Sequence, residues 1–101
     1  MLIVAAEVVV EEGALNGVQE ALGTMEEETR KEAGCLTYAF SVDVNDPTMV
    51  RIFERWESMD ALAAHFKTPH MAAFGSALSV IQPKSMDITV YEVEKEVPLP
   101  R

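Results

Sequence analysis

The order in which apolar periodicity changes along the chain limits the possible folds more than any other feature of the sequence. An apolar, β-branched run opens the chain, and apolar residues then recur at helical spacing from Leu15 to Met25, in a segment that ends at Gly34. Two extended runs follow as a hairpin joined by an Asn45-Asp46-Pro47 turn, and helical sequence separates them from a last extended run. The order βαββαβ predicts an α+β, ferredoxin-like fold, with a four-stranded antiparallel sheet and helices on one face. The expected strands are residues 2–10, 35–44, 49–56 and 86–94.

Two short helices are expected between the third and fourth strands. Ser58 is a good N-cap for the first, and Asp60 lies in its first turn, where a carboxylate favours the helix dipole. Thr68 caps the second helix, and Pro69 occupies its first position, where the missing N–H costs no hydrogen bond. His70 shares a face of this helix with Phe74, Ala77, Leu78 and Ile81, so its imidazole is expected to point inward.

The two faces of the predicted sheet differ less in polarity than the faces of a sheet that has one side exposed to water. In the second strand Leu36, Tyr38 and Phe40 face one way, and the opposite face carries the small groups of Cys35 and its alternate neighbours. The first strand is apolar on both faces apart from Glu7. Because a solvent-facing side is normally clearly polar, we expect this half-apolar face to pack against a second copy of the chain in a two-fold homodimer.

Composition narrows the classes of partner. A chain of 101 residues is one domain by length, here residues 1–96 followed by a proline-containing tail at 97–101. The formal net charge of −9 repels phosphate backbones and anionic membrane surfaces, so neither nucleic acid nor membrane is an expected partner. A single cysteine, Cys35, allows no intrachain disulfide or cysteine cluster, which suits a reducing cytoplasm. No apolar run approaches the ~18 residues of a membrane span.

The candidate site lies at one strand-to-helix turn, which gathers the only tryptophan, Trp56, and both histidines, His65 and His70. Imidazole titrates near neutral pH and is the usual general base of enzymes. Packing explains each histidine taken singly, with His65 bonded to a carbonyl or to Glu54 or Glu57, whereas two histidines converging on a tryptophan favour a functional site. The histidines are five residues apart across a proline, unlike the helical zinc motif, and no metal is expected. The sequence has no nucleotide or flavin signature.

Three strings, at residues 32–38, 54–58 and 62–70, resemble the antibiotic biosynthesis monooxygenase family, including its quinol monooxygenase members. They read Glu-Ala-Gly-Cys-Leu-Thr-Tyr, Glu-Arg-Trp-Glu-Ser and Leu-Ala-Ala-His-Phe-Lys-Thr-Pro-His, and the resemblance extends from the first strand to Tyr91. It implies a dimeric α+β barrel with residues 1–96 as the family domain. The haem-degrading branch is not expected, because only Trp56 matches its site: Glu7 stands at the asparagine position and the helix histidine falls near Gly75.

The resemblance implies a cofactor-independent monooxygenase that oxidises a small aromatic, phenolic or quinol substrate with molecular oxygen. His70 is the first candidate for the base and His65 the second, with Trp56 beside them in a pocket between sheet and helices. Two alternatives remain: an isomerase or tautomerase of a small metabolite that uses the same histidines without oxygen, and a non-catalytic, ligand-binding dimeric module. The expected pocket residues are Glu54, Tyr38, Phe40, Phe74 and Glu7.

Overall fold

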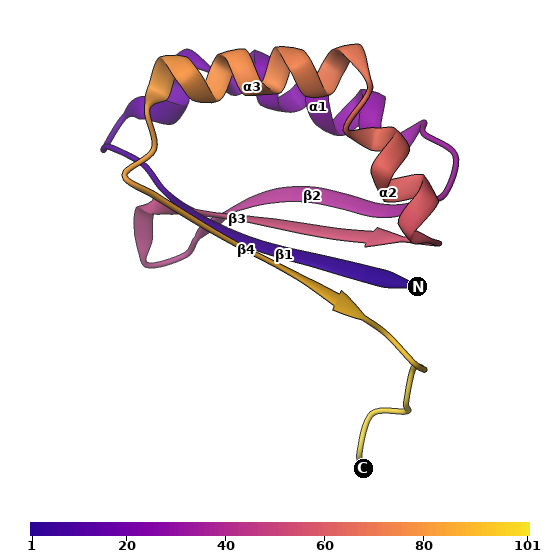
Figure 1. Cartoon of the computed structure of the whole chain (residues 1–101). Coiled ribbons are helices and arrows are strands. Elements are labelled where there is room, and N and C mark those ends of the chain that lie inside the picture. The colour runs from indigo at the N-terminus through magenta and orange to yellow at the C-terminus, as the bar shows by residue number, and fades with distance from the viewer.

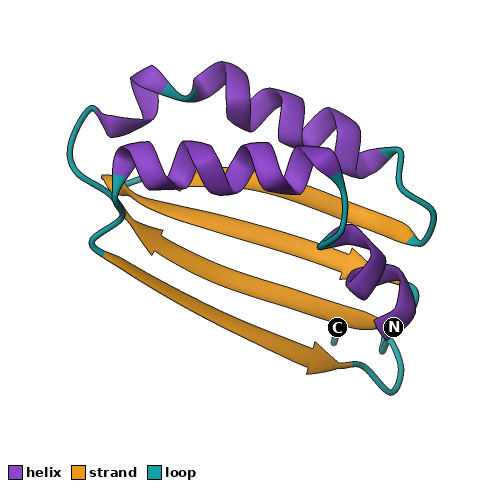
Figure 2. Ribbon diagram, turned by 45° about the horizontal axis from the view of Figure 1, so that its top comes forward, coloured by secondary structure: helices purple, strands orange, loops and turns teal.

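A computed structural model describes all 101 residues and confirms the ferredoxin-like arrangement. Four antiparallel strands form one sheet in the order β2-β3-β1-β4. The helices form a second layer on one face of this sheet (Figures 1 and 2). The strands are β1 Leu2–Val9, β2 Cys35–Asp43, β3 Asp46–Trp56 and β4 Ser85–Glu92, and the helices are α1 Gln19–Arg30, α2 Met59–His65 and α3 Pro69–Ile81, with a short 3-10 helix at Ala14–Gly17.

The core lies between the helices and the two central strands, β1 and β3. Alternate residues of each central strand face the helices, as the period of two predicts, so Val4 and Val8 of β1 are buried beside Val50 and Trp56 of β3. Helix α1 adds Met25 and α3 adds Phe74 to the same cluster. Trp56 has no exposed surface and lies at the end of the core nearest α2.

A β-bulge at the start of β2 corrects the predicted faces of that strand. Cys35 pairs with Trp56 and Thr37 pairs with Arg55, so one extra residue, Leu36, lies between two consecutive pairs. The extra residue inverts the alternation on its N-terminal side. Cys35 therefore packs against the core, and Leu36 is 44% exposed, although the sequence placed them on the opposite faces.

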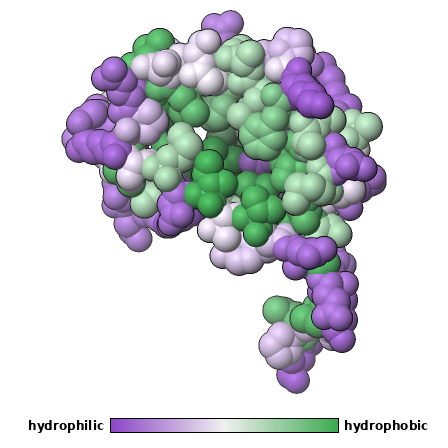
Figure 3. All heavy atoms as spheres, viewed as in Figure 1, coloured by the Kyte–Doolittle hydropathy of each residue, from purple (hydrophilic) through white to green (hydrophobic).

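Strand β4 lies at the edge of the sheet, where no helix covers it. Its residues Met86, Ile88 and Val90 pair with core-facing residues of β1, yet each of the three side chains is about half exposed. Apolar side chains gather on this open side, between the helices and the sheet (Figure 3). The residues after β4 extend away from the body as an arm (Figure 1). None of the helices has the length and apolar character needed to cross a membrane.

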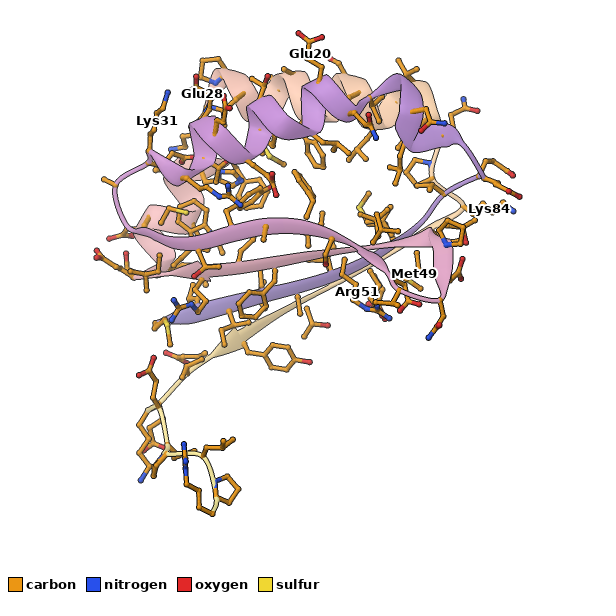
Figure 4. The ribbon with its side chains drawn as sticks, turned by 180° about the vertical axis from the view of Figure 1, so that it is seen from behind. Glu20, Glu28, Lys31, Met49, Arg51 and Lys84 are labelled. Carbon is orange, nitrogen blue, oxygen red and sulfur yellow. The ribbon has the colours of Figure 1, made fainter.

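The face of the sheet opposite the helices carries a mixture of ion pairs and apolar groups. Arg51 forms ion pairs with Glu7 at 3.1 Å and with Asp43 at 2.6 Å, and it lies on the uncovered side of the sheet (Figure 4). Phe53 and Tyr91 are about half exposed on the same face, beside a hollow of about 360 Å³. This face is neither a packed core nor a fully polar surface.

Candidate functional site

The junction between α2 and α3 holds both histidines in fixed positions. Ser58 caps α2 by accepting a hydrogen bond from the N–H of Ala61, as the sequence predicted. The hydroxyl of Thr68 accepts from the N–H of Met71 to cap α3, and it also donates to the carbonyl of His65 at 2.7 Å. One side chain thus ties the last residue of α2 to the first turn of α3. These two hydrogen bonds of the Thr68 hydroxyl fix the placement of His65 relative to His70.

The two histidines converge on one carboxylate oxygen, that of Glu32, which was not among the site residues predicted from the sequence. Glu32 Oε2 lies 2.7 Å from His65 Nδ1 and 2.7 Å from His70 Nε2. The side chain of His65 is 2% exposed, whereas those of Glu32 and His70 are 13% and 16% exposed. We call these three residues the Glu32–His65–His70 cluster. Of its two histidines, only His70 has appreciable contact with solvent.

The shared carboxylate sets the tautomers of both rings. An ionised carboxylate accepts hydrogen bonds and donates none. When the carboxylate accepts from two neutral imidazoles, the ring nitrogens that face Glu32 carry the protons, and the free lone pairs lie on His65 Nε2 and His70 Nδ1. A carboxylate in this position also stabilises the positive charge that an imidazole acquires when it takes up a proton. The arrangement can serve a histidine acting as a general base.

Gly34 explains how Glu32 comes so close to α2. This glycine has a φ of +84°, a left-handed conformation that glycine adopts without steric cost. A Cβ atom at residue 34 would lie 2.5 Å from the Cβ of Ala61 in α2. The chain therefore reverses directly after Glu32 and packs tightly on α2. Its carbonyl also accepts from the N–H of Glu57 at 2.8 Å, which closes the contact.

Aromatic and acidic groups surround His65 on the side of the core. The ring centroids of Trp56 and Tyr38 lie 4.9 and 5.7 Å from that of His65. Trp56 Nε1 donates to Glu54 Oε1 at 2.9 Å. Burial holds the pKa of the Glu54 carboxyl above its ordinary value, although the hydrogen bond from Trp56 acts in the opposite direction. Burial also raises the pKa of the Tyr38 hydroxyl, which keeps it neutral near neutral pH. Three predicted residues, Trp56, Tyr38 and Glu54, thus gather around His65.

The space expected to form the pocket, between sheet and helices, is packed with side chains. Phe40 and Phe74 stack with their ring centroids 5.5 Å apart, beside an entirely apolar void of about 20 Å³. Glu7 does not join the other predicted pocket residues, because it faces the opposite side of the sheet and pairs with Arg51. An alternation of period two puts Glu7 on the face away from Trp56 and Glu54. The predicted pocket residues therefore do not enclose one cavity.

An open groove instead reaches the cluster from the helical layer. It has a volume of about 420 Å³ and lies between α1 and α3, with His70 in its wall. Glu20, another wall residue, points away from the sheet, so the groove opens on the outer side of the helices (Figure 4). The remaining lining residues are Gly17, Ala21, Thr24, Met25 and Ala73. Of the three cluster residues, only His70 lines this groove.

Replacing Trp56 by phenylalanine is expected to lower the free energy of unfolding by about 2–4 kcal/mol, because it opens a cavity and leaves Glu54 without its N–H donor. Urea denaturation followed by circular dichroism measures this loss. Phe66→Leu is a matched control, since Phe66 is 61% exposed and surface changes rarely exceed about 0.5 kcal/mol. Equal losses from the two variants would contradict the central place of Trp56 in the core.

One known protein family matches most of the chain. The family described as antibiotic biosynthesis monooxygenase matches residues 1–77. An uncharacterised protein of Synechocystis sp. is 31% identical over 70 residues, which cover 69% of this chain and 48% of that protein. The Escherichia coli protein YgiN, named a probable quinol monooxygenase, is 39% identical over 56 residues, 48% of this chain and 54% of that protein. The chain thus matches about half the length of each of these two relatives.

Solved structures extend the likeness to the whole chain. A Deinococcus radiodurans protein whose name places it in the same family superposes with a TM-score of 0.89 at 25% identity, and the match covers 100% of both chains. A similarly named protein from Nitrosomonas europaea superposes with a TM-score of 0.86 at 18% identity, over 94% of this chain and 100% of that one. The second likeness concerns the fold alone.

Proposed function

Because the chain belongs to the antibiotic biosynthesis monooxygenase family, we propose that it is a cofactor-independent monooxygenase that oxidises a small aromatic, phenolic or quinol substrate with molecular oxygen. The observation that carries the proposal is the pair of histidines held on one carboxylate oxygen, with His70 in the wall of an open groove. The name of the Escherichia coli relative supports the quinol substrate class.

The proposed reaction begins with removal of a proton from the substrate. The substrate lies in the groove between α1 and α3 with its hydroxyl toward His70, whose Nδ1 lone pair accepts the proton. The Glu32 carboxylate, 2.7 Å from Nε2 of the same ring, then stabilises the imidazolium. His65 hydrogen-bonds to the same carboxylate oxygen and packs against Trp56 and Tyr38. Its role is to hold Glu32 in place, and it does not contact the substrate.

The phenolate then reduces oxygen without help from a cofactor. A phenolate is electron-rich enough to transfer an electron to O₂, which closed-shell molecules rarely do. For a phenol with a free para position, one oxygen atom becomes the new quinone carbonyl and the other leaves as water. The substrate supplies all four electrons, so the balance needs no external reductant. The protein has only to orient the ring, remove the proton and limit the access of water.

Oxygen uptake tests the proposal directly. Metal-free and flavin-free protein is incubated in an oxygen electrode with a panel of reduced quinones and phenols, and ¹⁸O₂ is used to label the product. We expect uptake that scales with protein concentration and one labelled oxygen atom per quinone formed. Conversion of a substrate without oxygen uptake would identify an isomerase instead. Uptake that depends on added flavin or metal would contradict the cofactor-independent mechanism.

We also propose that the chain works as a homodimer paired through the uncovered face of the sheet. Phe53 and Tyr91 support this, because each exposes about half of a large apolar side chain there. The edge strand β4 and the arm after it are in position to extend the contact with the partner (Figure 1). Obligate dimers bury large apolar faces of this kind.

The dimer predicts a mass of about twice 11.1 kDa in light scattering at micromolar concentration. Phe53→Glu is expected to shift that mass toward the monomer, because it buries one unpaired negative charge from each chain in the proposed interface. Val80→Glu on α3 is the matched control, since Val80 is exposed on the helical layer, away from this face. A monomeric wild-type chain, or dissociation of both variants alike, would contradict the proposed face.

A further inference from the structure

We propose that Glu32, His65 and His70 form a binding site for a divalent transition-metal ion, and that the bound ion inhibits the oxygenase reaction. The three ligand atoms, Glu32 Oε2, His65 Nδ1 and His70 Nε2, all lie within 4.8 Å of one another. They come from three elements that meet at one point: the turn after α1, the end of α2 and the start of α3. Two imidazoles and one carboxylate are the ligand set of several zinc and non-haem iron sites.

The spacing of the ligand atoms is close to what a metal requires. Zinc lies about 2.0–2.2 Å from nitrogen and oxygen ligands, so ligand atoms around a tetrahedral ion are separated by about 3.3 Å. Both nitrogen-to-oxygen distances in the cluster are 2.7 Å, the length of a hydrogen bond. A displacement of the carboxylate by about 0.6 Å would bring both nitrogen-to-oxygen distances to the tetrahedral spacing. The two histidine nitrogens lie within 4.8 Å of each other, so rotation of the imidazole rings has to supply the remaining adjustment.

Metal binding requires each ring to change its tautomer. A nitrogen that binds a metal carries no proton, so the protons now facing Glu32 must move to His65 Nε2 and His70 Nδ1. The new N–H of His65 then needs an acceptor inside the protein. Glu54 is a buried carboxyl that accepts a hydrogen bond from Trp56, whose ring centroid lies 4.9 Å from that of His65, so it is the nearby group proposed for this part. Metal-bound histidines commonly donate their second N–H to a carboxylate in this way.

The same tautomer change is the reason for inhibition, and this step rests on the proposed function. In the metal-bound form His70 Nδ1 carries a proton and cannot accept one from a substrate. With three protein ligands, the ion keeps at least one position for water or an anion. A bound ion therefore prevents His70 from accepting the proton of the substrate.

Binding of Zn²⁺ is measured without any turnover. Tag-free protein is dialysed against a chelator and titrated with Zn²⁺ in competition with a chromophoric indicator, and Co²⁺ provides a visible spectrum of the coordination. We expect one ion per chain, and a loss of affinity of at least about 100-fold in Glu32→Gln and His70→Ala. The glutamine oxygen can still accept both N–H groups, so Glu32→Gln removes a ligand while preserving the hydrogen bonds of the fold.

Two control variants exclude other ligands. Glu57→Gln makes the same substitution at an exposed glutamate, and Cys35→Ser removes the only thiol. Burial raises the pKa of that thiol, which disfavours the thiolate that a metal would need. Both controls are expected to bind Zn²⁺ as tightly as the wild type. A Zn²⁺ affinity that depends on Cys35, or that survives both Glu32→Gln and His70→Ala, would overturn the proposed site.

Imidazole resonances give a second measurement that does not depend on how well the variants fold. The chain has two histidines, so a long-range ¹H–¹⁵N spectrum contains only two rings to assign. One equivalent of Zn²⁺ should shift both rings of the wild type, in the direction of the exchanged tautomers. Unchanged rings at one equivalent would overturn the site. Inhibition is scored separately: if Zn²⁺ shifts both rings and turnover persists, the site stands and the role of His70 as base is wrong.

Discussion

Replacing His70 by alanine is expected to lower turnover by about 10²–10⁴-fold, the usual contribution of a positioned general base. His70 is the more exposed of the two histidines and lines the groove, so its loss removes the proton acceptor without opening the core. The melting temperature should accordingly stay close to that of the wild type. Steady-state oxygen uptake measures the turnover, and calorimetry measures the melting temperature.

Alkaline pH should partly rescue this variant. A phenol ionises unaided as the pH rises toward its own pKa near 10, so the fraction of phenolate increases and the missing base matters less. The ratio of wild-type to variant rates is therefore expected to fall as the pH rises. His65→Ala serves as the comparison, because His65 is 2% exposed and faces the core. Equal, pH-independent losses from both variants, each with a lower melting temperature, would show that the histidines only hold the helix junction together.

The order of strands and helices was predictable from the sequence because it depends on local signals. Periods of two and 3.6, the Ser58 and Thr68 caps and Pro69 at the start of α3 all act within a few residues. The β2 bulge was not predictable in this way. Its extra residue, Leu36, is apolar and fits the alternating pattern of the strand, so the sequence pattern gives no sign of the bulge. Only the pairing with β3 shows it.

The candidate site was predicted only in part, because its residues are not all close together in the sequence. The histidines and Trp56 are close in sequence, and they do meet, with the rings of Trp56 and His65 4.9 Å apart. Glu32 was missed because it lies 33 residues from His65 and 38 from His70, and no periodic pattern connects residues so far apart. Its one signal was its place in the family-like string, two residues before Gly34, which the structure gives a positive φ.

No single cavity forms among the expected pocket residues, because periodicity tells which way a side chain faces and not whether the facing layers leave a gap. Tyr38, Phe40 and Phe74 do face the space between sheet and helices, where they pack on one another. Close-packed interiors leave few voids larger than a water molecule. The groove that reaches His70 lies between α1 and α3, and its small residues, such as Ala21 and Ala73, gave no signal in the sequence.

Replacing Glu32 by alanine is expected to lower turnover by about 10²–10³-fold, because His70 loses the carboxylate that orients its ring and stabilises its charge. Glu57→Ala, the same deletion at an exposed glutamate, should leave turnover within about twofold of the wild type.

The double variant Glu32→Ala/His70→Ala decides how Glu32 acts. A carboxylate that works through His70 has nothing left to orient once the imidazole is gone, so the second deletion should add less than about tenfold to the loss from His70→Ala alone. Residues that act as one unit show this strong departure from additivity, and the bond of 2.7 Å between Glu32 and His70 predicts it here. Fully multiplicative losses would mean that Glu32 contacts the substrate itself or acts through His65. Comparing His65→Ala with Glu32→Ala/His65→Ala then separates those two routes, because only the route through His65 would disappear in the double variant.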